Sequence, residues 1–377
     1  MGDRLRLGLI FGGRSVEHEV SVVTAEHVLA AAARDRFELV PIGVTKAGAW
    51  LSPEETQRQL AQPAPPFQKR LESPARAAPV EAGAPRPSTL RLGSGQASSG
   101  RADLRPAIDA LAGLDVVFPL VHGTYGEDGT LQGLLELAGL PYVGCGVAAS
   151  ALGMDKALMK AVFRDAGLPV AEHVVLRAPD GDRALLAAAR DVERRFGYPA
   201  FVKPANGGSS VGISKVSSRE ELAGAIVEAA RCDRKLVIEK AVVGREVECA
   251  VLGNADAEAS PIGEIRHRRE FYDYEAKYLD ARTEVIVPAD LPAGTVERVQ
   301  DLALRAFCAI DGAGMSRVDF FYCPDGSLVV DEINTIPGFT PGSMFPRLWQ
   351  ARGVNYAQLI TRLVDLALAR HKERPVV

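Results

Sequence analysis

The chain has 377 residues, of which 47% are hydrophobic and 24% charged, as in ordinary globular proteins with two or three domains. A formal net charge of −4 gives no electrostatic case for binding nucleic acid or a membrane surface, and no apolar run approaches the roughly 20 residues of a membrane-spanning helix. Five scattered cysteines without a C-x-x-C pair favour reduced thiols over a disulfide framework or a zinc site, and the first residues offer no signal peptide. We therefore expect a cytoplasmic protein that binds neither nucleic acid nor a membrane.

The first expected elements have the order of a parallel sheet. A strand over residues 5–11 ends at Gly12-Gly13, a helix follows over about 15–33, and a second strand occupies 37–44. This β-α-β order predicts parallel strands. The glycine pair is only a weak indication of nucleotide binding, because the full G-x-G-x-x-G fingerprint is absent. Glu17, His18 and Glu19 stand where a substrate amine could be held, although a solvated first helical turn explains them equally well.

Residues 62–102 differ in composition from the rest of the chain. Proline and small polar residues crowd this stretch, which predicts a long and weakly structured insertion rather than a domain linker. A buried strand is expected over 115–121, and a glycine-rich loop over 122–129 then leads into a helix. His122 opens that loop, and structural and functional roles are about equally expected for it.

The middle of the chain predicts strands with helices on one side, an α+β organisation. A strand over 198–204 is followed by the Gly- and Ser-rich loop 206–212. Such a loop between two strands can fold its backbone N–H groups over phosphates, and Lys203 supplies a charge for them. It is not a Walker A loop, in which Gly-Lys-Ser/Thr would open a helix. Further strands are expected over 235–240 and 246–252.

Residues 315–334 predict a β-hairpin whose loop is Asp325-Gly326, because Val, Ile, Phe and Tyr fill both arms. With a two-residue loop, Asp319 lies opposite Glu332 and Arg317 lies opposite Asn334. Side chains alternate along a strand, so these four share one face. That face is expected to be apolar near the turn, at Phe321 and Val330, and polar at its open end.

The polar end of this hairpin predicts a metal and phosphate site. Two carboxylates and an amide oxygen suit Mg²⁺, which usually also binds substrate phosphates. Arg317 suits a phosphoryl group or an oxyanion. A solvated edge pair with one cross-strand ion pair explains these residues about equally well. The Gly- and Pro-rich loop 335–343, whose backbone N–H groups can bind an anion, favours the site with a substrate loop beside it.

The order of these motifs resembles that of the ATP-grasp ligases and, among them, of the D-alanine–D-alanine ligase family of peptidoglycan synthesis. The matching stretches lie over 11–21, 122–129, 154–156, 201–204, 208–212, 237–240, 272–278, 316–319, 331–334 and 337–338. They span nearly the whole chain, and their common order makes the resemblance specific. The insertion over 62–102 departs from it and receives no catalytic role.

The resemblance implies an α/β fold with the three-domain ATP-grasp architecture. It places an N-terminal parallel βαβ (pre-ATP-grasp) domain over 1–150, with the insertion inside it. A central ATP-grasp subdomain with a lid loop spans 151–240, and a C-terminal subdomain with the metal and substrate site spans 241–377. ATP lies between the last two, which are α+β domains. The resemblance also implies a cytoplasmic homodimer.

The resemblance implies specific nucleotide and metal ligands. The phosphates would meet Lys156 and Lys203, under a lid over 207–212 that includes Gly208 and Ser210. The adenine amino group would meet Glu239, the ribose hydroxyls Glu246, and the nucleotide also Lys240. Two Mg²⁺ (or Mn²⁺) ions would be held by Asp319, Glu332 and Asn334.

The implied substrates are ATP and two molecules of D-alanine. The first D-alanine carboxylate attacks the γ-phosphate, and the amine of the second then displaces phosphate from the acyl phosphate. Around the first D-alanine the resemblance places Glu17 on its amino group, Ser209 and Tyr278 linked to Glu17, and His122 nearby. Around the second it places Lys277, Ser343 and the N–H of Met344. Arg317 and the backbone of Gly338 would stabilise the tetrahedral intermediate.

The sequence leaves three alternative functions open. The first is a ligase of the same fold that joins D-alanine to another D-amino or D-hydroxy acid. The second is an NAD-dependent oxidoreductase built on the N-terminal βαβ unit, against which the missing fingerprint and the carboxylate hairpin count. The third is a non-catalytic ATP-binding module, which would need neither metal carboxylates nor a second-substrate loop.

Overall fold

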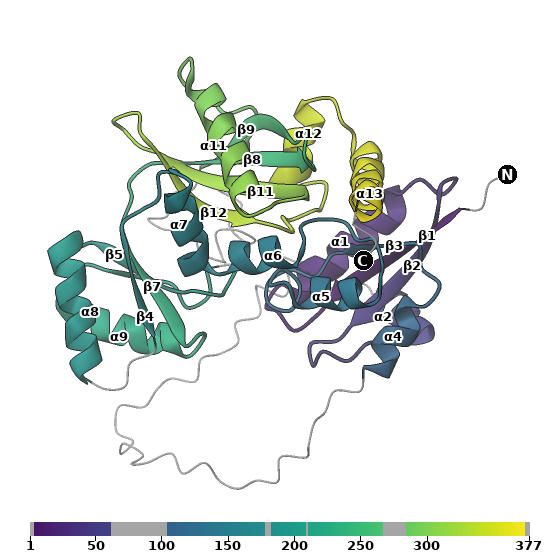
Figure 1. Ribbon diagram of the computed structural model, residues 1–377, viewed down its shortest axis with the longest axis horizontal. Coiled ribbons are helices and arrows are strands. Elements are labelled where there is room, and N and C mark those ends of the chain that lie inside the picture. The colour runs from purple at the N-terminus through teal and green to yellow at the C-terminus, as the bar shows by residue number, and fades with distance from the viewer. Residues whose placement is uncertain (1–3, 62–103, 178–181, 209, 267–283, 374–377) are drawn as a thin grey trace, which may run out of the picture.

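The computed structural model describes residues 4–61, 104–177, 182–208, 210–266 and 284–373. The insertion expected over 62–102 and the predicted site residues Ser209, Lys277 and Tyr278 lie outside these ranges. Within them the chain forms three sheets, arranged side by side with helices around them (Figure 1). None of the helices described is both long and apolar enough to cross a membrane.

The N-terminal sheet is parallel, as predicted. Its strands are β1 (Leu5–Gly12), β2 (Phe37–Val44) and β3 (Val116–Pro119), in the order β2-β1-β3. Its helices are α1 (His18–Ala31), α2 (Pro53–Ala61), α4 (Arg105–Leu111) and α5 (Thr130–Leu137). Leu9 and Ile10 point to opposite faces of β1 and both are fully buried, as expected for a central parallel strand. Helix α1 begins at His18, later than expected, because the Ser15 hydroxyl accepts the N–H of Glu17 in a preceding turn (3.0 Å).

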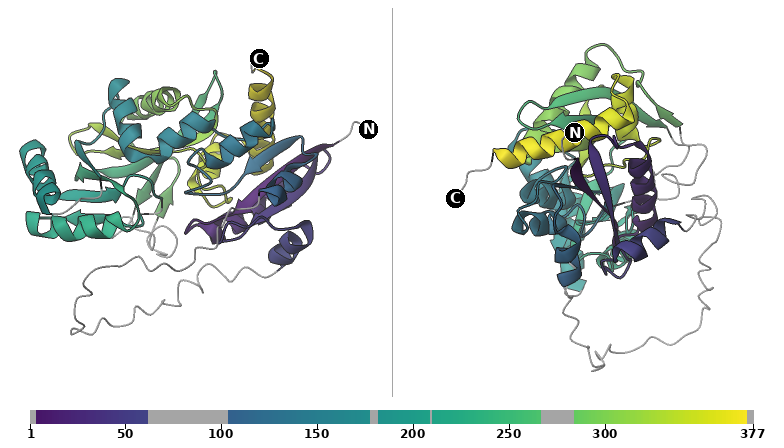
Figure 2. Two further views of the ribbon diagram at one scale, coloured as in Figure 1. Left: turned by 60° about the horizontal axis from the view of Figure 1, so that its bottom comes forward. Right: turned by 90° about the vertical axis from the view of Figure 1, so that its right-hand side faces the viewer.

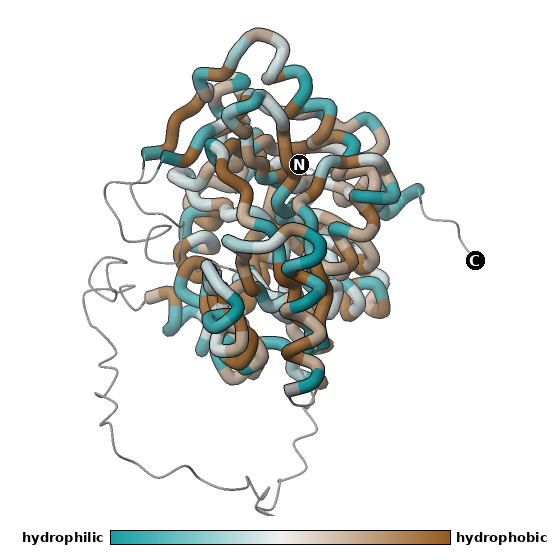
Figure 3. Tube along the Cα trace, turned by 90° about the vertical axis from the view of Figure 1, so that its left-hand side faces the viewer, coloured by the Kyte–Doolittle hydropathy of each residue, from teal (hydrophilic) through white to brown (hydrophobic). Residues whose placement is uncertain are grey.

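The central sheet is antiparallel and carries helices on one face. Its strands are β4 (His173–Arg177), β5 (Ala200–Pro204), β6 (Ser214–Val216) and β7 (Lys235–Lys240), in the order β4-β7-β5-β6. Helices α8 (Asp182–Arg195) and α9 (Arg219–Ala230) pack against Val202 and Ile238. Because side chains alternate along a strand, the neighbouring Lys203 and Glu239 point to the opposite face. Hydrophilic and hydrophobic residues alternate along the chain in Figure 3, in keeping with helices and strands that have one buried face.

The C-terminal sheet is antiparallel and is covered on both faces. Its strands are β8 (Arg245–Gly253), β9 (Glu258–Arg266), β10 (Glu284–Ile286), β11 (Gly314–Tyr322) and β12 (Leu328–Asn334), in the order β10-β9-β8-β11-β12. The surrounding helices are α6 (Val147–Met154), α7 (Lys156–Asp165), α11 (Thr295–Ala309), α12 (Met344–Ala351) and α13 (Tyr356–Lys372). Helices α7 and α11 share one apolar core with this sheet.

The opposite face of the C-terminal sheet shares its core with the N-terminal sheet. Helices α12 and α13 pack Trp349 and Leu363 into a cluster that includes Leu252 of β8 and Leu7 of β1. Figures 1 and 2 show α13, in yellow, beside the purple N-terminal sheet. This common core fixes the carboxyl end of β1 relative to the hairpin β11-β12.

The hairpin register is confirmed at its polar end and differs at its turn. Arg317 pairs with Asn334, and Asp319 pairs with Glu332, as predicted. The loop has three residues rather than two, since the N–H of Cys323 bonds to the carbonyl of Ser327 and Gly326 has a φ of +81°.

A β-bulge restores the register. It lies between Asp319 and Phe320 on β11, opposite the extra residue Asp331 of β12. Near the turn Phe320 therefore pairs with Val330, and the expected shared face of Phe321 and Val330 is wrong. The bulge leaves Asp331 outside the pairing.

Candidate active site

Two cavities lie side by side between the three sheets. The first, here called the loop cavity, has a volume of about 430 Å³ and is bordered by Glu17, His122 and the loop 335–343. The second, the sheet cavity, has a volume of about 380 Å³ and lies between the central sheet and the hairpin. Their common wall is formed by Lys156, Gly207, Gly208, Glu248, Arg317 and Glu332.

The structure brings the predicted site residues together at these two cavities. Those at the loop cavity are Glu17, His122, Lys156, Gly208, Arg317, Glu332, Asn334, Gly338, Ser343 and Met344. Those at the sheet cavity are Lys156, Lys203, Gly208, Ser210, Glu239, Lys240, Glu246, Arg317, Asp319 and Glu332. Every predicted site residue that the structure describes therefore lines at least one cavity.

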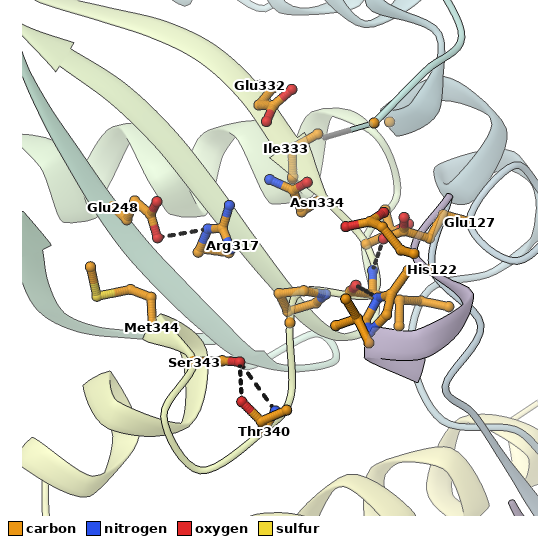
Figure 4. A pocket seen from close by; sticks show the side chains of 18 of the residues that line it. His122, Glu127, Glu248, Arg317, Glu332, Ile333, Asn334, Thr340, Ser343 and Met344 are labelled. Atoms are coloured by element: carbon orange, nitrogen blue, oxygen red, sulfur yellow. Dashed lines mark hydrogen bonds and ion pairs between the residues drawn. The ribbon is translucent and has the colours of Figure 1, made fainter. Parts of the chain in front are cut away.

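Arg317 is the centre of the polar end of the hairpin. Its Nε and Nη2 donate to the two carboxylate oxygens of Asp319, both at 2.7 Å. Figure 4 shows its contact with Glu248 on the neighbouring strand, where Nε lies 2.9 Å from Oε2. Burial alone would lower the pKa of Arg317, but Asp319 and Glu248 raise it well above its ordinary value. The guanidinium is thus a fixed cation in the common wall.

Lys156 brings a second cation to that wall. Its Nζ lies 3.5 Å from Glu332 Oε2 and donates to the carbonyl oxygen of Gly207 at 2.9 Å. Lys156 opens α7, whose N-cap Asp155 accepts two backbone N–H groups. The next residue of the loop, Gly208, approaches Glu17 closely, because a Cβ there would lie 3.4 Å from Glu17 Oε2. The N-terminal and central units therefore meet at this loop.

The acidic and amide side chains of the hairpin have the chemistry of a divalent-cation site. Asn334 Nδ2 donates to Asp319 Oδ2 at 3.0 Å, and Glu332 lies beside them in the common wall. In the described ranges no group of three or more His, Cys, Asp or Glu side chains is placed to hold a metal. A set of two carboxylates and one amide oxygen still consists of the hard donors that Mg²⁺ takes, so the residues present fit the ion by donor type.

The sheet cavity contains charged groups that the sequence analysis did not assign. Lys203 Nζ lies 2.9 Å from Glu239 Oε2 and 3.3 Å from Asp331 Oδ1. Burial alone would lower the pKa of Lys203, but Asp331 and Glu239 raise it above its ordinary value. A further lysine, Lys160, lies on the far side of Glu239. The sequence contains an indication for each of these two residues. Asp331 belongs to the 331–334 motif, and Lys160 lies one helical turn after Lys156.

The loop 335–343 is held in place on both sides of Gly338. The N–H of Ile336 donates to Glu127 Oε1 at 3.1 Å, and the Nδ1 of His122 donates to the carbonyl oxygen of Ile336 at 3.1 Å. After Gly338, the hydroxyl of Tyr356 donates to the carbonyl oxygen of Phe339 at 2.6 Å. These bonds fix the backbone on both sides of Gly338.

Glu127 is a site residue that the sequence analysis missed, although it belongs to the glycine-rich loop that His122 opens. Its two oxygens accept the N–H groups of Gly123 (2.6 Å) and Ile336, so it links that loop to the loop 335–343. Burial, and then the nearby Glu17 carboxylate, raise the pKa of Glu127 to about 8. The structure therefore places a carboxyl group with a raised pKa in the wall of the loop cavity.

Replacing Glu127 by glutamine is expected to remove a pH dependence of stability. The folded-state pKa lies above the unfolded value of 4.5, so the folded chain binds more protons between pH 4.5 and about 8. Stability from this group is full below that window and is lost as the pH rises through it. For one proton the slope is at most about 1.4 kcal/mol per pH unit. Thermal unfolding midpoints across pH 5–9 should show the unmodified chain falling relative to Glu127→Gln; parallel curves would contradict this.

Comparisons with known proteins agree with this geometry. The family model described as D-ala D-ala ligase N-terminus matches residues 6–145, and that described as D-ala D-ala ligase C-terminus matches residues 162–365. The chain is 44% identical to a D-alanine–D-alanine ligase of Geobacillus kaustophilus, over 99% of this chain and 97% of that protein.

Two solved structures have a similar fold. The D-Ala:D-Ser ligase VanG of Enterococcus faecalis superposes with a TM-score of 0.76 at 32% identity, covering 97% of this chain and 100% of that one. The D-alanine–D-alanine ligase of Bacillus anthracis, solved as a complex with ATP, superposes with a TM-score of 0.73 at 28% identity, covering 99% of each chain.

Proposed function

This chain belongs to the D-alanine–D-alanine ligase family, and from that membership we propose that its two cavities together make D-alanyl-D-alanine for peptidoglycan synthesis. Chains of this family are ATP-dependent ligases with mixed α/β folds, and this one has the parallel N-terminal sheet and the two antiparallel sheets of that fold. The observation that carries the proposal is the common wall of Lys156, Arg317 and Glu332, since a nucleotide on one side and an amino acid on the other would meet there.

ATP would occupy the sheet cavity. Phe201, Ile213 and Phe320 offer apolar surface for a base, and the carboxylate of Glu239, which lines the same cavity, would accept the amino group of the base. Glu246 and Lys240 line the same cavity and would meet the ribose and the nucleotide. Lys156 and Lys203 would take the phosphates under the loop with Gly208 and Ser210. We propose a division into 1–150, 151–240 and 241–377 with ATP between the last two, in which α7 of the middle segment packs on the C-terminal sheet.

Two divalent cations, Mg²⁺ or Mn²⁺, would be held by Asp319, Glu332 and Asn334. When bound, they would neutralise charge on the phosphates at the point where phosphoryl transfer takes place. Arg317 contacts Asp319, one of the two carboxylates of this proposed cation site. Its two hydrogen bonds hold Asp319, and its charge remains available to an oxyanion in the loop cavity.

Two D-alanine molecules would occupy the loop cavity. Glu17, with Ser209, Tyr278 and His122 around it, would hold the ammonium group of the first. The carboxylate of this first D-alanine attacks the γ-phosphate of ATP, which forms an acyl phosphate and releases ADP. The amine of the second D-alanine, after losing a proton, attacks the carbonyl carbon and phosphate leaves.

The second D-alanine would be held by its carboxylate, through Lys277, Ser343 and the N–H of Met344. The N–H of Gly338 and Arg317 would stabilise the tetrahedral intermediate that its attack produces. Condensation to a peptide is uphill in water, so transfer of the phosphoryl group supplies the driving force. Positioning and charge stabilisation would supply most of the acceleration.

The chain would act in the cytoplasm as a homodimer. Free thiols at all five cysteines support a reducing compartment. The dimer follows from the family resemblance alone, and light scattering during size-exclusion chromatography tests it.

A phosphate-release assay tests the reaction. With ATP and Mg²⁺, D-alanine is expected to stimulate phosphate release, and mass spectrometry should identify D-alanyl-D-alanine as the product. L-alanine should give no stimulation, and D-serine and D-lactate, each added with D-alanine at pH 7, should give minor products. A mixed dipeptide or a depsipeptide as the main product would show that D-serine or D-lactate, and not D-alanine, is the preferred second substrate. Phosphate release that does not depend on D-alanine would overturn the ligase assignment for this chain.

A further inference from the structure

A buried lysine stands behind the wall of the sheet cavity. Lys160 lies on α7, and its side chain is 1% exposed. It lines neither cavity, so it cannot touch a ligand in either. A lysine buried to this degree needs charged partners, because desolvation of a lone ammonium is costly.

The partners of Lys160 lie on strands of two different sheets. Its Nζ lies 3.2 Å from Glu239 Oε1 of β7, donates to the backbone oxygen of Asp331 on β12 at 3.1 Å, and lies 4.0 Å from Asp331 Oδ1. Lys203 of β5 contacts the same two carboxylates from the cavity side. The four residues form a closed ring of two positive and two negative charges, here called the charge ring.

The backbone explains why these groups meet. Asp331 is the extra residue of the β-bulge, and bulges redirect side chains near functional sites. Lys160 follows Lys156 by four residues on α7, so the two lie on the same side of that helix. Lys156 forms an ion pair with Glu332 in the common wall, and Lys160 donates to the backbone oxygen of Asp331, the residue before Glu332. One helix thereby holds two consecutive residues of β12.

We propose that Lys160 is a positioning residue for the nucleotide, which holds Glu239 and the bulged Asp331 from behind the cavity wall. This inference rests on the proposed function, in which Glu239 and Lys203 bind ATP. Without the ammonium of Lys160, the two carboxylates would share the single charge of Lys203. Glu239 would then lose the ion pair that holds its Oε1 from behind the wall, and Lys203 would be drawn away from the phosphates.

Removing the charge of Lys160 tests the proposal. Lys160→Gln keeps a donor for the backbone oxygen of Asp331 and removes the cation. We expect the KM for ATP, and the Kd of ATP measured by calorimetry without D-alanine, to rise about tenfold or more. The KM for D-alanine at saturating ATP should change less than about threefold, since Lys160 borders only groups of the sheet cavity.

A matched control separates positioning from general stability. Arg362 also forms an ion pair between a helix and a strand, with Glu258 at 3.0 Å, and lines neither cavity. Arg362→Met should lower the thermal unfolding midpoint and leave the KM for ATP unchanged. An equal rise of that KM in both variants would overturn the role of Lys160.

The double variant Lys160→Gln/Asp331→Asn gives a second test with a neutral ring. Its loss of ATP affinity should be at least about threefold smaller than the product of the two single losses, because the uncompensated charge is gone. If Lys160→Gln alone does not fold, the double variant should still bind ATP more than about threefold more weakly than the unmodified chain, because Glu239 lacks its partner behind the wall even when the ring is neutral. Binding within threefold would overturn the proposal.

The calorimetric measurement distinguishes failure of the proposed function from failure of the role of Lys160. An unmodified chain that does not bind ATP would overturn the proposed function, and the role of Lys160 with it. An unmodified chain and a Lys160→Gln variant that bind ATP equally well would overturn the role of Lys160 alone.

Discussion

Glu332→Gln is expected to lower the rate of ligation by about 10²–10³-fold, the loss that follows removal of one electrostatic stabiliser from an active site. Glu332 lies in the wall common to both cavities, with Lys156 Nζ 3.5 Å from its Oε2. Glutamine keeps the shape and removes the negative charge that would hold a divalent cation beside the phosphates. Asp319→Asn should act in the same direction, because Asp319 belongs to the same proposed cation site. Phosphate release at saturating ATP, D-alanine and Mg²⁺ measures both losses.

A carboxylate elsewhere in the same hairpin provides the control. Asp325 lies in the turn, where its Oδ1 accepts the N–H of Ser327 at 2.9 Å, and it lines neither cavity. Asp325→Asn should retain nearly normal turnover. Nearly normal turnover of Glu332→Gln at saturating Mg²⁺ would instead show that the hairpin does not hold the divalent cation.

Arg317→Lys should lower kcat/KM for D-alanine by a similar factor, about 10²–10³-fold. The planar guanidinium bonds both oxygens of Asp319 and also contacts Glu248. An ammonium group keeps the charge but cannot make these contacts at once, so the exchange is not conservative at a bidentate site. The loss should fall mainly on kcat, because the proposed oxyanion forms only during the attack of the second amine. Steady-state kinetics with D-alanine as the varied substrate measures this.

Arg305→Lys serves as its counterpart at a peripheral arginine. Arg305 donates to the backbone oxygens of Ala166 and Gly167 and lines neither cavity. Its replacement should leave kcat/KM within about threefold of the unmodified value. Should Arg317→Lys fall within the same range, Arg317 would have no role in the intermediate.

The sequence predicted the polar end of the hairpin and not its turn. A two-residue loop at Asp325-Gly326 predicts Asp319 opposite Glu332, and the structure has this pair. Pro324 adds one residue to the loop, and the bulge at Asp331 compensates for it in the other arm. Two errors of opposite sign therefore cancel at the open end, whereas the pairs near the turn are shifted.

The residues that the sequence analysis missed act across long separations in the chain. Glu127 contacts Ile336, and Lys160 contacts Glu239 and Asp331. Neither contact follows from helix or strand periodicity, because each depends on how one sheet packs against another. The parallel order of the first strands could be predicted because it is set locally by a β-α-β pattern.

The shared core of the first and last parts of the chain has a consequence for how the protein is made. Leu7 and Phe11 of β1 are buried in the same cluster as Leu363 of α13. During synthesis, α13 leaves the ribosome only after every preceding element, so the part of the first sheet's apolar face that α13 covers stays exposed until then. The central sheet, whose cluster is closed by α8 and α9, needs no such wait. The middle of the chain can therefore mature before its beginning, and a stalled nascent chain would expose the N-terminal strands to chaperones.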